Sequence, residues 1–531
     1  MDQQANLSSG VALSKLANFL ITSFEKEEIK NQTKHGINVN RFVSEIATWY
    51  EKFRNAMDYR EEEVVRRAAI ERILKRRLLF GGNGEKIASP LMRELLWARY
   101  FPDSSISEED VKKVAHTIDL YLALRTELIS REINIGVKLD TLIYQLLSSH
   151  LEIMLNKNKD IEFISNFIFH ILKPHIVIKD DTEENRDVQV FIAVRRAFAK
   201  DDLAFLRFHL FEQYFGKLTE SSLPKIVANF QKGQREIARQ INYPLKERII
   251  SYVKKQLPAF LIFTEILRKQ RAGTRSLIKN LPEFQNAVFT VSEARYKTIS
   301  SKVRRAIIRS VIFILLTKFI FAFTVEATYD NIFLGKIAWD SLIINVVAPP
   351  ILMVIASLFI RTPDRNNTKR IYDRINSILF IDDPELDRKL TINLKPENKH
   401  PILNFTFTSL WWIAFILSFG LITFILSKLH FSIASQGIFI FFVAIISFFT
   451  YRISQTARSY TIPFRQSFFV PILDFLFMPI IRVGRRFTEG LVQINILIYL
   501  FDYLIETPFK EIFGFLEQWF FFLQTKREEL G

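Results

Sequence analysis

The stretch that decides the fold is an apolar hairpin whose two arms read AIIRSVIFILLTKFIFAFTV (306–325) and SLIINVVAPPILMVIASLFI (341–360). Each arm is about as long as a helix needs to be to cross a hydrocarbon core of roughly 30 Å. The second arm carries no charge, whereas the first carries Arg309 near its start and Lys318 near its middle. A charge at that depth costs on the order of 3 kcal/mol on insertion scales. The hairpin therefore predicts two transmembrane helices, one of which holds a costly lysine.

Two further apolar stretches follow the hairpin. Residues 401–427 and 431–451 contain no charged side chain and are long enough to span a bilayer. We therefore expect a transmembrane domain over residues 306–465, with a long loop at 361–400. The predicted spans lie near 306–325, 341–360, 403–426 and 431–451.

Basic residues are concentrated on one side of these four predicted helices. The segment 225–305 holds 18 Lys or Arg against 5 Asp or Glu, and the loop 361–400 holds nine Lys or Arg. The connections on the other side, 326–340 and 428–430, hold one lysine each. Because positively charged loops stay in the cytoplasm, we expect a multi-pass protein of the cell inner (plasma) membrane with both termini in the cytoplasm.

The basic segment also predicts a contact with anionic lipid headgroups, to which each Lys or Arg near the surface contributes about 1 kcal/mol. Nucleic-acid binding is the alternative, but a basic stretch next to a transmembrane helix is explained more simply by lipid, and we expect no nucleic-acid partner. Residues 257–267, within this segment, are mostly apolar and fit either an interfacial helix or a core helix. The predicted lipid contacts are Lys254, Lys255, Arg268, Lys269, Arg271, Lys302, Arg304 and Arg305.

The part of the chain before the membrane region is patterned as helix after helix. We expect an all-α fold, in which a cytoplasmic helical domain (1–224) and a basic membrane-proximal helical segment (225–305) precede the polytopic membrane domain. Ser107, with Asp110 three residues later, forms a capping-box pattern that opens one of these helices. The one weak strand candidate is 175–178.

The last segment, 466–531, is predicted to be a re-entrant or interfacial amphipathic tail. Its apolar stretch 466–481 contains Asp474 and two prolines and has basic residues at both ends. Both flanks are therefore expected on the cytoplasmic side, which favours a re-entrant or interfacial element over a fifth crossing.

The sequence shows no motif of a catalytic, cofactor or metal site. The chain has no cysteine, which excludes disulfides and thiolate ligands. The stretch FGGNGEK (80–86) lacks the spacing and the Ser or Thr of a P-loop and fits a helix C-cap better. His170 and His175 are five residues apart, which places them on different faces of a helix. We expect neither an enzyme nor a bound cofactor.

Polar residues inside the predicted membrane region form the one sharp site hypothesis. Lys318, Asn345 and Asp474 are candidates for an intramembrane polar site, and the proline pair after Asn345 can free backbone carbonyls to line a cavity. The structural alternative is that Lys318 snorkels or pairs with Asp474, while Glu326 belongs to a hydrated outer loop.

Two functions from different classes follow from this organisation. The short loops on the outer side leave most of the recognisable surface in the cytoplasm. The first hypothesis is therefore a membrane-anchored scaffold or regulator that binds a cytoplasmic protein partner through its helical domain. The alternative is a small-molecule or ion transporter or channel that uses polar groups of the hairpin. Self-association of the chain is left open.

Overall fold

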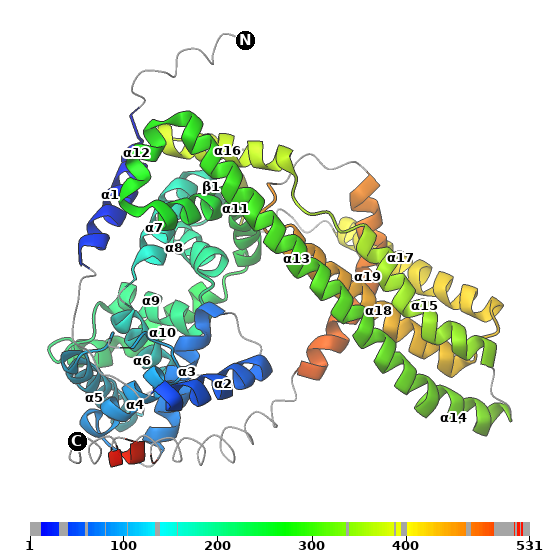
Figure 1. The fold of residues 1–531 in the computed structure, drawn as a ribbon, viewed down its shortest axis with the longest axis horizontal. Helices are drawn as coiled ribbons and strands as arrows, with labels where there is room; N and C mark the ends of the chain where they lie inside the picture. Colours follow the sequence, from blue (N-terminus) through cyan, green and yellow to red (C-terminus); the bar gives the residue numbers. More distant parts are fainter. Residues whose placement is uncertain are drawn as a thin grey trace, which may run out of the picture. The chain divides into compact units, whose positions relative to one another are not determined.

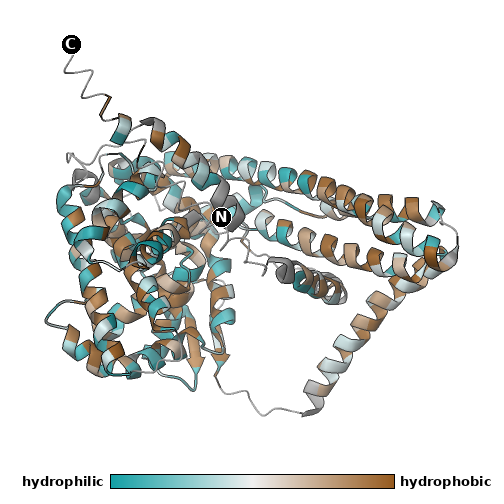
Figure 2. Ribbon diagram, turned by 90° about the horizontal axis from the view of Figure 1, so that it is seen from below, coloured by the Kyte–Doolittle hydropathy of each residue, from teal (hydrophilic) through white to brown (hydrophobic). Residues whose placement is uncertain are grey.

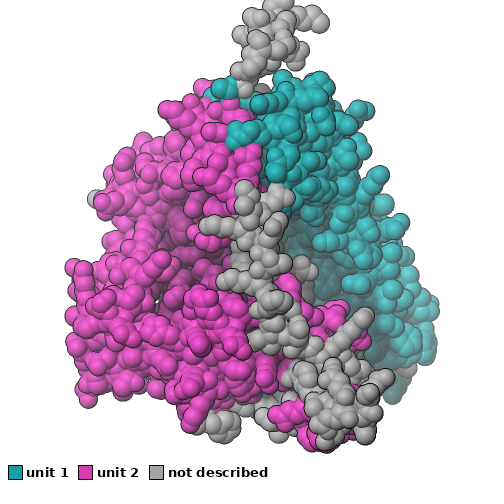
Figure 3. Space-filling view, turned by 60° about the vertical axis from the view of Figure 1, so that its left-hand side comes forward, with its two compact units in different colours: residues 1–12, 255–381, 395–495 teal, residues 13–254, 382–394, 496–531 magenta. Residues whose placement is uncertain are grey.

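The chain divides into two compact units, which Figure 3 shows in different colours. The helical unit comprises mainly Leu13–Lys254 and Asp382–Leu394, and the apolar unit comprises mainly Lys255–Ile381 and Lys395–Asn495. The residues that the computed structural model describes are 12–30, 41–58, 62–79, 81–103, 105–132, 138–156, 158–335, 339–386, 389–394, 401–462, 469–492, 515, 518–520 and 522–523.

The helical unit consists almost entirely of helices, as the all-α prediction required (Figure 1). These are α1 (Lys15–Lys30), α2 (Arg41–Asp58), α3 (Glu62–Leu78), α4 (Gly84–Trp97), α5 (Glu108–Ser130), α6 (Leu139–Leu155), α7 (Asp160–Leu172), η1 (Lys173–His175), α8 (Glu183–Val194), η2 (Arg195–Ala199), α9 (Leu203–Phe215) and α10 (Leu223–Ile241). The next helix, α11 (Lys246–Gln270), begins in the helical unit and ends in the apolar unit.

One hydrophobic core joins α3, α4, α5, α6, α9 and α10. Ile118 and Tyr121 on α5 are at most 1% exposed within it, and α10 contributes the buried Ile226 and Phe230. The apolar face of α10 completes this core, and the helical unit extends to Lys254.

The capping box expected at Ser107 is present. The Ser107 hydroxyl accepts a hydrogen bond from the Asp110 main-chain N–H (3.2 Å), and the Ser107 main-chain N–H donates to the Asp110 carboxylate (2.9 Å). Two main-chain donors at the start of α5 are thereby satisfied, which fixes where this helix begins.

The glycine-rich stretch after α3 serves the backbone. Gly81 and Gly82 have φ angles of 76° and 136°, which side chains with a Cβ rarely adopt. Gly84 opens α4 against α5, and a Cβ there would lie 1.9 Å from the carbonyl oxygen of Ala115. The stretch is a turn between α3 and α4 in which Gly84 permits close helix packing.

A two-stranded parallel sheet ties a distant segment to the helical unit. Strand β1 (Ile176–Lys179) pairs with β2 (Leu390–Asn393), with Ile176 opposite Leu390. The main-chain N–H of Lys15, at the start of α1, also donates to the Asp382 carboxylate (2.9 Å). The sequence indicated the first strand but not its partner, which comes from the predicted loop 361–400.

The apolar unit contains the longest helices. Its elements are α12 (Thr274–Lys279), α13 (Leu281–Phe321), α14 (Ala327–Tyr329), α15 (Trp339–Leu358), α16 (Arg365–Phe380), α17 (Pro401–Lys428), α18 (Ile433–Ala457) and α19 (Phe469–Val492). Helix α13 is one continuous helix of 41 residues, about 60 Å long. The change from charged to apolar sequence at residue 306 therefore falls inside a helix and not at a joint.

Among the described residues, three helical stretches are long and apolar enough to cross a membrane: Leu281–Phe333, Phe405–Lys428 and Ile433–Ala457. The remaining predicted span, 341–360, corresponds to α15, whose apolar stretch Leu342–Leu358 is shorter. Figure 2 shows that these helices consist largely of hydrophobic residues. Large apolar side chains on them are exposed, including Leu316 (59% exposed), Ile416 (66%) and Phe405 (74%). Such a large exposed apolar surface marks a membrane or protein contact.

Residues 469–492 form a single helix, α19, packed against α17 and α18. A Cβ at Gly484 would lie 2.0 Å from the carbonyl oxygen of Ala444, so glycine lets α19 approach α18 closely. The assignment of 466–531 to a re-entrant or interfacial tail stays a prediction. Most of the tail after residue 492 lies outside the described residues.

Burial of His150 on α6 makes the stability of the helical unit sensitive to pH. Its ring packs against Tyr121 and Phe208, and burial, with the Lys217 ammonium as a second cause, lowers the pKa of His150 from 6.5 to about 4. The folded state thus holds this imidazole neutral where the unfolded chain would bind a proton. Stability from this group is complete above pH 6.5 and is lost as pH falls toward 4.

We predict that lowering the pH from 7 to 4 decreases the free energy of unfolding of the full-length chain in detergent. The decrease should be about 2–3 kcal/mol larger for the wild type than for His150→Phe. The variant keeps the ring contacts and cannot titrate. Urea titrations followed by far-UV circular dichroism at the two pH values measure the difference. Equal pH dependence of both proteins would contradict the role of His150.

A buried polar cluster among the apolar helices

Four polar residues meet inside the apolar unit, and we call them the polar cluster. They are Lys318 on α13, Glu326 at the end of the π-helical segment η4 (Ala322–Glu326), Asn345 on α15 and Ser435 on α18. Lys318, Glu326 and Asn345 are 0% exposed and Ser435 is 2% exposed. The cluster is therefore enclosed by protein on all sides.

The Glu326 carboxylate is the common acceptor of the cluster. Its Oε1 accepts from the Lys318 ammonium at 2.5 Å. Its Oε2 accepts from the Asn345 side-chain amide and from the Ser435 hydroxyl, the latter at 3.3 Å. The Asn345 amide also donates to the main-chain carbonyl of Ser435 (3.2 Å). One carboxylate thus connects three helices that are distant in sequence.

The π-helical segment explains how Glu326 reaches Lys318. In a regular α-helix, residues eight positions apart are offset by about 80° around the axis. The wider turn of η4 takes up an additional residue, which reduces this offset and brings both side chains to the same face. A second π-helical segment, η5 (Asp330–Leu334), follows one turn later. Such irregular turns occur frequently at functional sites.

The ion pair accounts for the lysine that the hydropathy pattern left unexplained. Removing two charges from water is costly, and their attraction compensates only when the remaining hydrogen-bonding groups are also satisfied. Here Asn345 and Ser435 satisfy the second carboxylate oxygen, and the Lys318 ammonium also lies 5.1 Å from the centre of the Phe442 ring. The pair is compensated locally, without contact with solvent.

Two acceptor atoms near the cluster have no hydrogen-bond partner within the described part of the chain. They are Oδ1 of Asn345 and Oδ1 of Asp330, the first residue of η5. Asp330 is 2% exposed. Buried acceptors without partners are costly and mark positions where a proton or a bound group would be stabilised.

Of the three predicted intramembrane residues, the structure brings Lys318 and Asn345 together. Each donates a hydrogen bond to the Glu326 carboxylate. That glutamate was expected in a hydrated outer loop, an interpretation that its complete burial overturns. The sequence signal for its burial was that Glu326 continues the same helical pattern as Lys318. Asp474 lies on α19, and its side chain is outside the described residues.

Most of the predicted lipid-contact residues are exposed. Arg271 is half-buried; the exposed ones are Lys254, Lys255, Arg268, Lys269, Lys302, Arg304 and Arg305. Lys269 pairs with Glu265 at 3.3 Å. The apolar side chains between these basic groups are buried, including Phe260 (2% exposed) and Phe263 (3%). Residues 257–267 are therefore covered by protein. This agrees with a core helix and not with an interfacial helix, the two alternatives predicted for this stretch.

Comparison with known proteins adds no assignment for this site. The chain matches no protein-family model, no curated protein and no solved structure.

The polar cluster predicts a strong asymmetry between single and double variants. Lys318→Met leaves the Glu326 carboxylate buried without its cation and should lower the free energy of unfolding by about 3–5 kcal/mol. The double variant Lys318→Met/Glu326→Gln removes both charges but keeps an acceptor for Asn345, and should recover most of that loss. Unfolding in mixed SDS micelles, followed by circular dichroism, measures both.

Arg309→Met is the matched control, because it removes an exposed cation from the same helix. It should change the free energy of unfolding by less than about 0.5 kcal/mol. A double variant as unstable as Lys318→Met would show that the two charges do not act as a pair.

Proposed function

We propose that this chain is a multi-pass inner-membrane protein with four transmembrane helices, and that it acts as a membrane-anchored scaffold or regulator whose helical unit binds a protein partner in the cytoplasm. The observation that carries the proposal is the pairing of β1 with β2. It makes a segment between two membrane-type helices part of the helical unit.

This pairing supports an even number of crossings between the two strands. β1 and β2 exchange main-chain hydrogen bonds, so they lie on the same side of the membrane. If the apolar part of Leu281–Phe333 crosses the membrane, the chain must return before β2, and α15 is the helix available to do so. The proline pair and the short apolar stretch of α15 are compatible with this role because the helix packs against α13 and α18.

Charge supports the cytoplasmic side for the helical unit. The exposed Lys302, Arg304 and Arg305 lie immediately before the apolar part of α13, at the level where anionic headgroups would meet them. The turn between the membrane-type helices α17 and α18, taken from Lys428 to Ser432, contains Lys428 as its one Lys or Arg. This asymmetry is the one that orients inner-membrane proteins.

The closed polar cluster supports an anchoring role for the apolar unit. A pathway for a substrate would require solvent to reach Lys318 or Asn345, and both are 0% exposed. The helical unit, by contrast, has its own core and a large polar surface. Recognition of a partner is therefore assigned to the helical unit, and the apolar unit holds it at the membrane.

A transporter or channel is the second candidate. It is favoured by the acceptors of Asn345 and Asp330 that have no hydrogen-bond partner among the described residues, beside two π-helical segments. In that case the enclosed cluster would be one state of an alternating cycle, in which Glu326 exchanges its internal cation for a proton or an external cation.

The topology is tested with single cysteines, for which the cysteine-free chain is a ready background. We expect Ile332→Cys and Leu429→Cys to react with a membrane-impermeant maleimide in intact cells. Lys112→Cys and Arg361→Cys should react only after permeabilisation. Labelling of Arg361→Cys in intact cells would exclude a membrane-crossing α15 and with it the four-span proposal.

The two functions are separated by a photo-crosslinking experiment. A benzoylphenylalanine at Phe19 or Leu79, both exposed on the helical unit, should give a crosslink to one abundant cytoplasmic protein in cells. Glu326→Gln should leave this crosslink intact. The absence of crosslinks, together with a cation or proton flux in proteoliposomes that Glu326→Gln abolishes, would replace the scaffold proposal by the transporter.

A further inference from the structure

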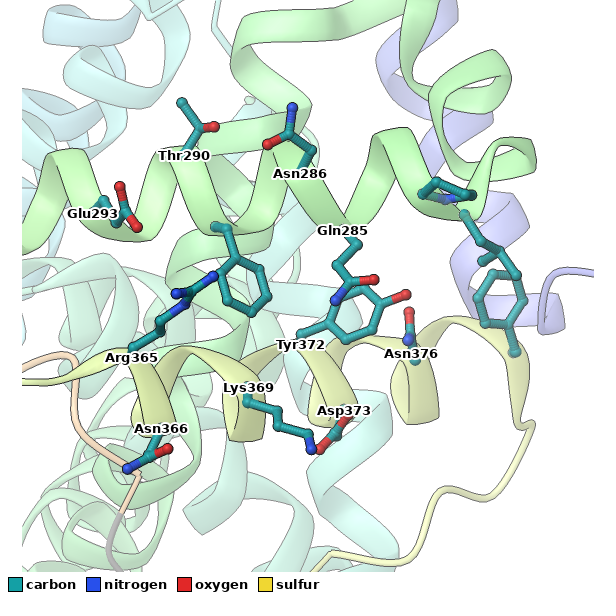
Figure 4. A pocket seen from close by; sticks show the side chains of 14 residues that line it. Gln285, Asn286, Thr290, Glu293, Arg365, Asn366, Lys369, Tyr372, Asp373 and Asn376 are labelled. Carbon is teal, nitrogen blue, oxygen red and sulfur yellow. The ribbon is translucent and has the colours of Figure 1, made fainter. Parts of the chain in front are cut away.

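An open groove runs between α13 and α16 in the apolar unit, outside the apolar part of α13 (Figure 4). Its volume is about 970 Å³. One wall is α13 from Leu281 to Glu293, and the other is α16 from Arg365 to Phe380. The Arg365 guanidinium lies 6.0 Å from the centre of the Phe289 ring, and the Phe284 and Tyr372 rings are 6.3 Å apart. These contacts link the two walls of the groove.

The groove has the length of a short extended chain. The thirteen residues from Leu281 to Glu293, separated by twelve helical steps, rise about 18 Å along α13. A β-strand rises about 3.3 Å per residue, so roughly five residues of an extended peptide fit along it. A globular small molecule would use only part of this length.

Neutral amides and aromatic rings dominate the lining. Gln285, Tyr372 and Asn376 project from the two helices into the space between them (Figure 4). Each amide offers both a donor and an acceptor, as a peptide main chain requires along its two edges. Oδ1 of Asn376 is buried and has no hydrogen-bond partner within the described residues. The lining rings of Phe289, Tyr372 and Phe380 offer apolar surface for side chains.

The charges of the lining balance. Arg365 and Lys369 stand against Glu293 and Asp373, so the groove has no net attraction for a polyanion such as RNA. Its mixed polar and aromatic lining also disfavours an amphipathic helix, which needs a continuous apolar groove.

The α13 wall of the groove is separated from the apolar sequence. The groove ends at Glu293, thirteen residues and about 20 Å along α13 before the apolar sequence begins at residue 306. The headgroup layer on one side of a bilayer is only about 5–8 Å thick. A ligand along the α13 wall is therefore expected from the aqueous side.

We propose that this groove binds an extended peptide segment of a partner protein, about five residues long and without net charge. Side-chain amides of α13 and α16 pair with its main chain, and the aromatic rings receive its side chains. The inference deepens the proposed scaffold function and rests on it, since it gives the chemistry by which a partner would be recognised. It places recognition beside the membrane, in addition to any contact on the helical unit.

The test uses the full-length chain in nanodiscs and a phage-displayed library of linear nine-residue peptides. We expect enrichment of peptides with neutral polar and aromatic residues. For a synthetic copy of the most enriched peptide, measured by fluorescence anisotropy, Gln285→Leu and Asn376→Leu should each weaken binding by about tenfold. Asn376→Gln keeps the amide and should retain most of the affinity.

Gln270→Leu is the matched control, because it removes an exposed amide from α11, away from the groove, and should leave the affinity unchanged. The inference is overturned if no peptide is enriched, if Asn376→Leu and Asn376→Gln bind alike, or if maltoheptaose binds where peptides do not. A crosslinked partner on the helical unit that persists in these variants, combined with no peptide binding, would remove the groove proposal alone. Peptide binding without any cellular crosslink would remove the proposed scaffold and keep the groove.

Discussion

The buried ion pair between Lys318 and Glu326 is the constraint on which the apolar unit depends. A single charge in this environment would be costly, and the carboxylate compensates for it only because Asn345 and Ser435 satisfy its second oxygen. Three helices must therefore keep their relative rotation and depth, since a shift of one residue would leave a charge or a donor unpaired. The interaction specifies the packing of α13, α15 and α18 more precisely than their interchangeable apolar side chains do.

Helix α13 connects this constraint to the rest of the chain. Its apolar part carries Lys318, and its first turns form one wall of the groove between α13 and α16. No hinge separates these regions, because the described backbone is helical from Leu281 to Phe321. A bound segment in the groove and the polar cluster thus act on the same rigid element.

The pairing of β1 with β2 has a comparable effect on topology. Four main-chain positions on each strand attach the connection between α16 and α17 to the helical unit. Hydropathy alone does not decide whether α15 crosses the membrane, because its apolar stretch is short. Strand pairing, by contrast, requires only that the two paired segments lie on the same aqueous side. The proposal of four crossings therefore rests on hydrogen bonding outside the membrane as much as on hydropathy within it.

The sequence by itself determined the all-α class, the long apolar helices, the capping box at Ser107 and the importance of Lys318, because periodicity, capping and the cost of a buried charge are local properties. It did not determine the partner of Lys318, the continuation of the helical unit beyond residue 224 or the partner of the strand near residue 176. Those features arise from contacts between residues far apart in the chain. For Glu326 they also depend on a π-helical turn that no local sequence pattern predicts. Only the tertiary structure could decide them, because complementarity between surfaces has no signature in one segment alone.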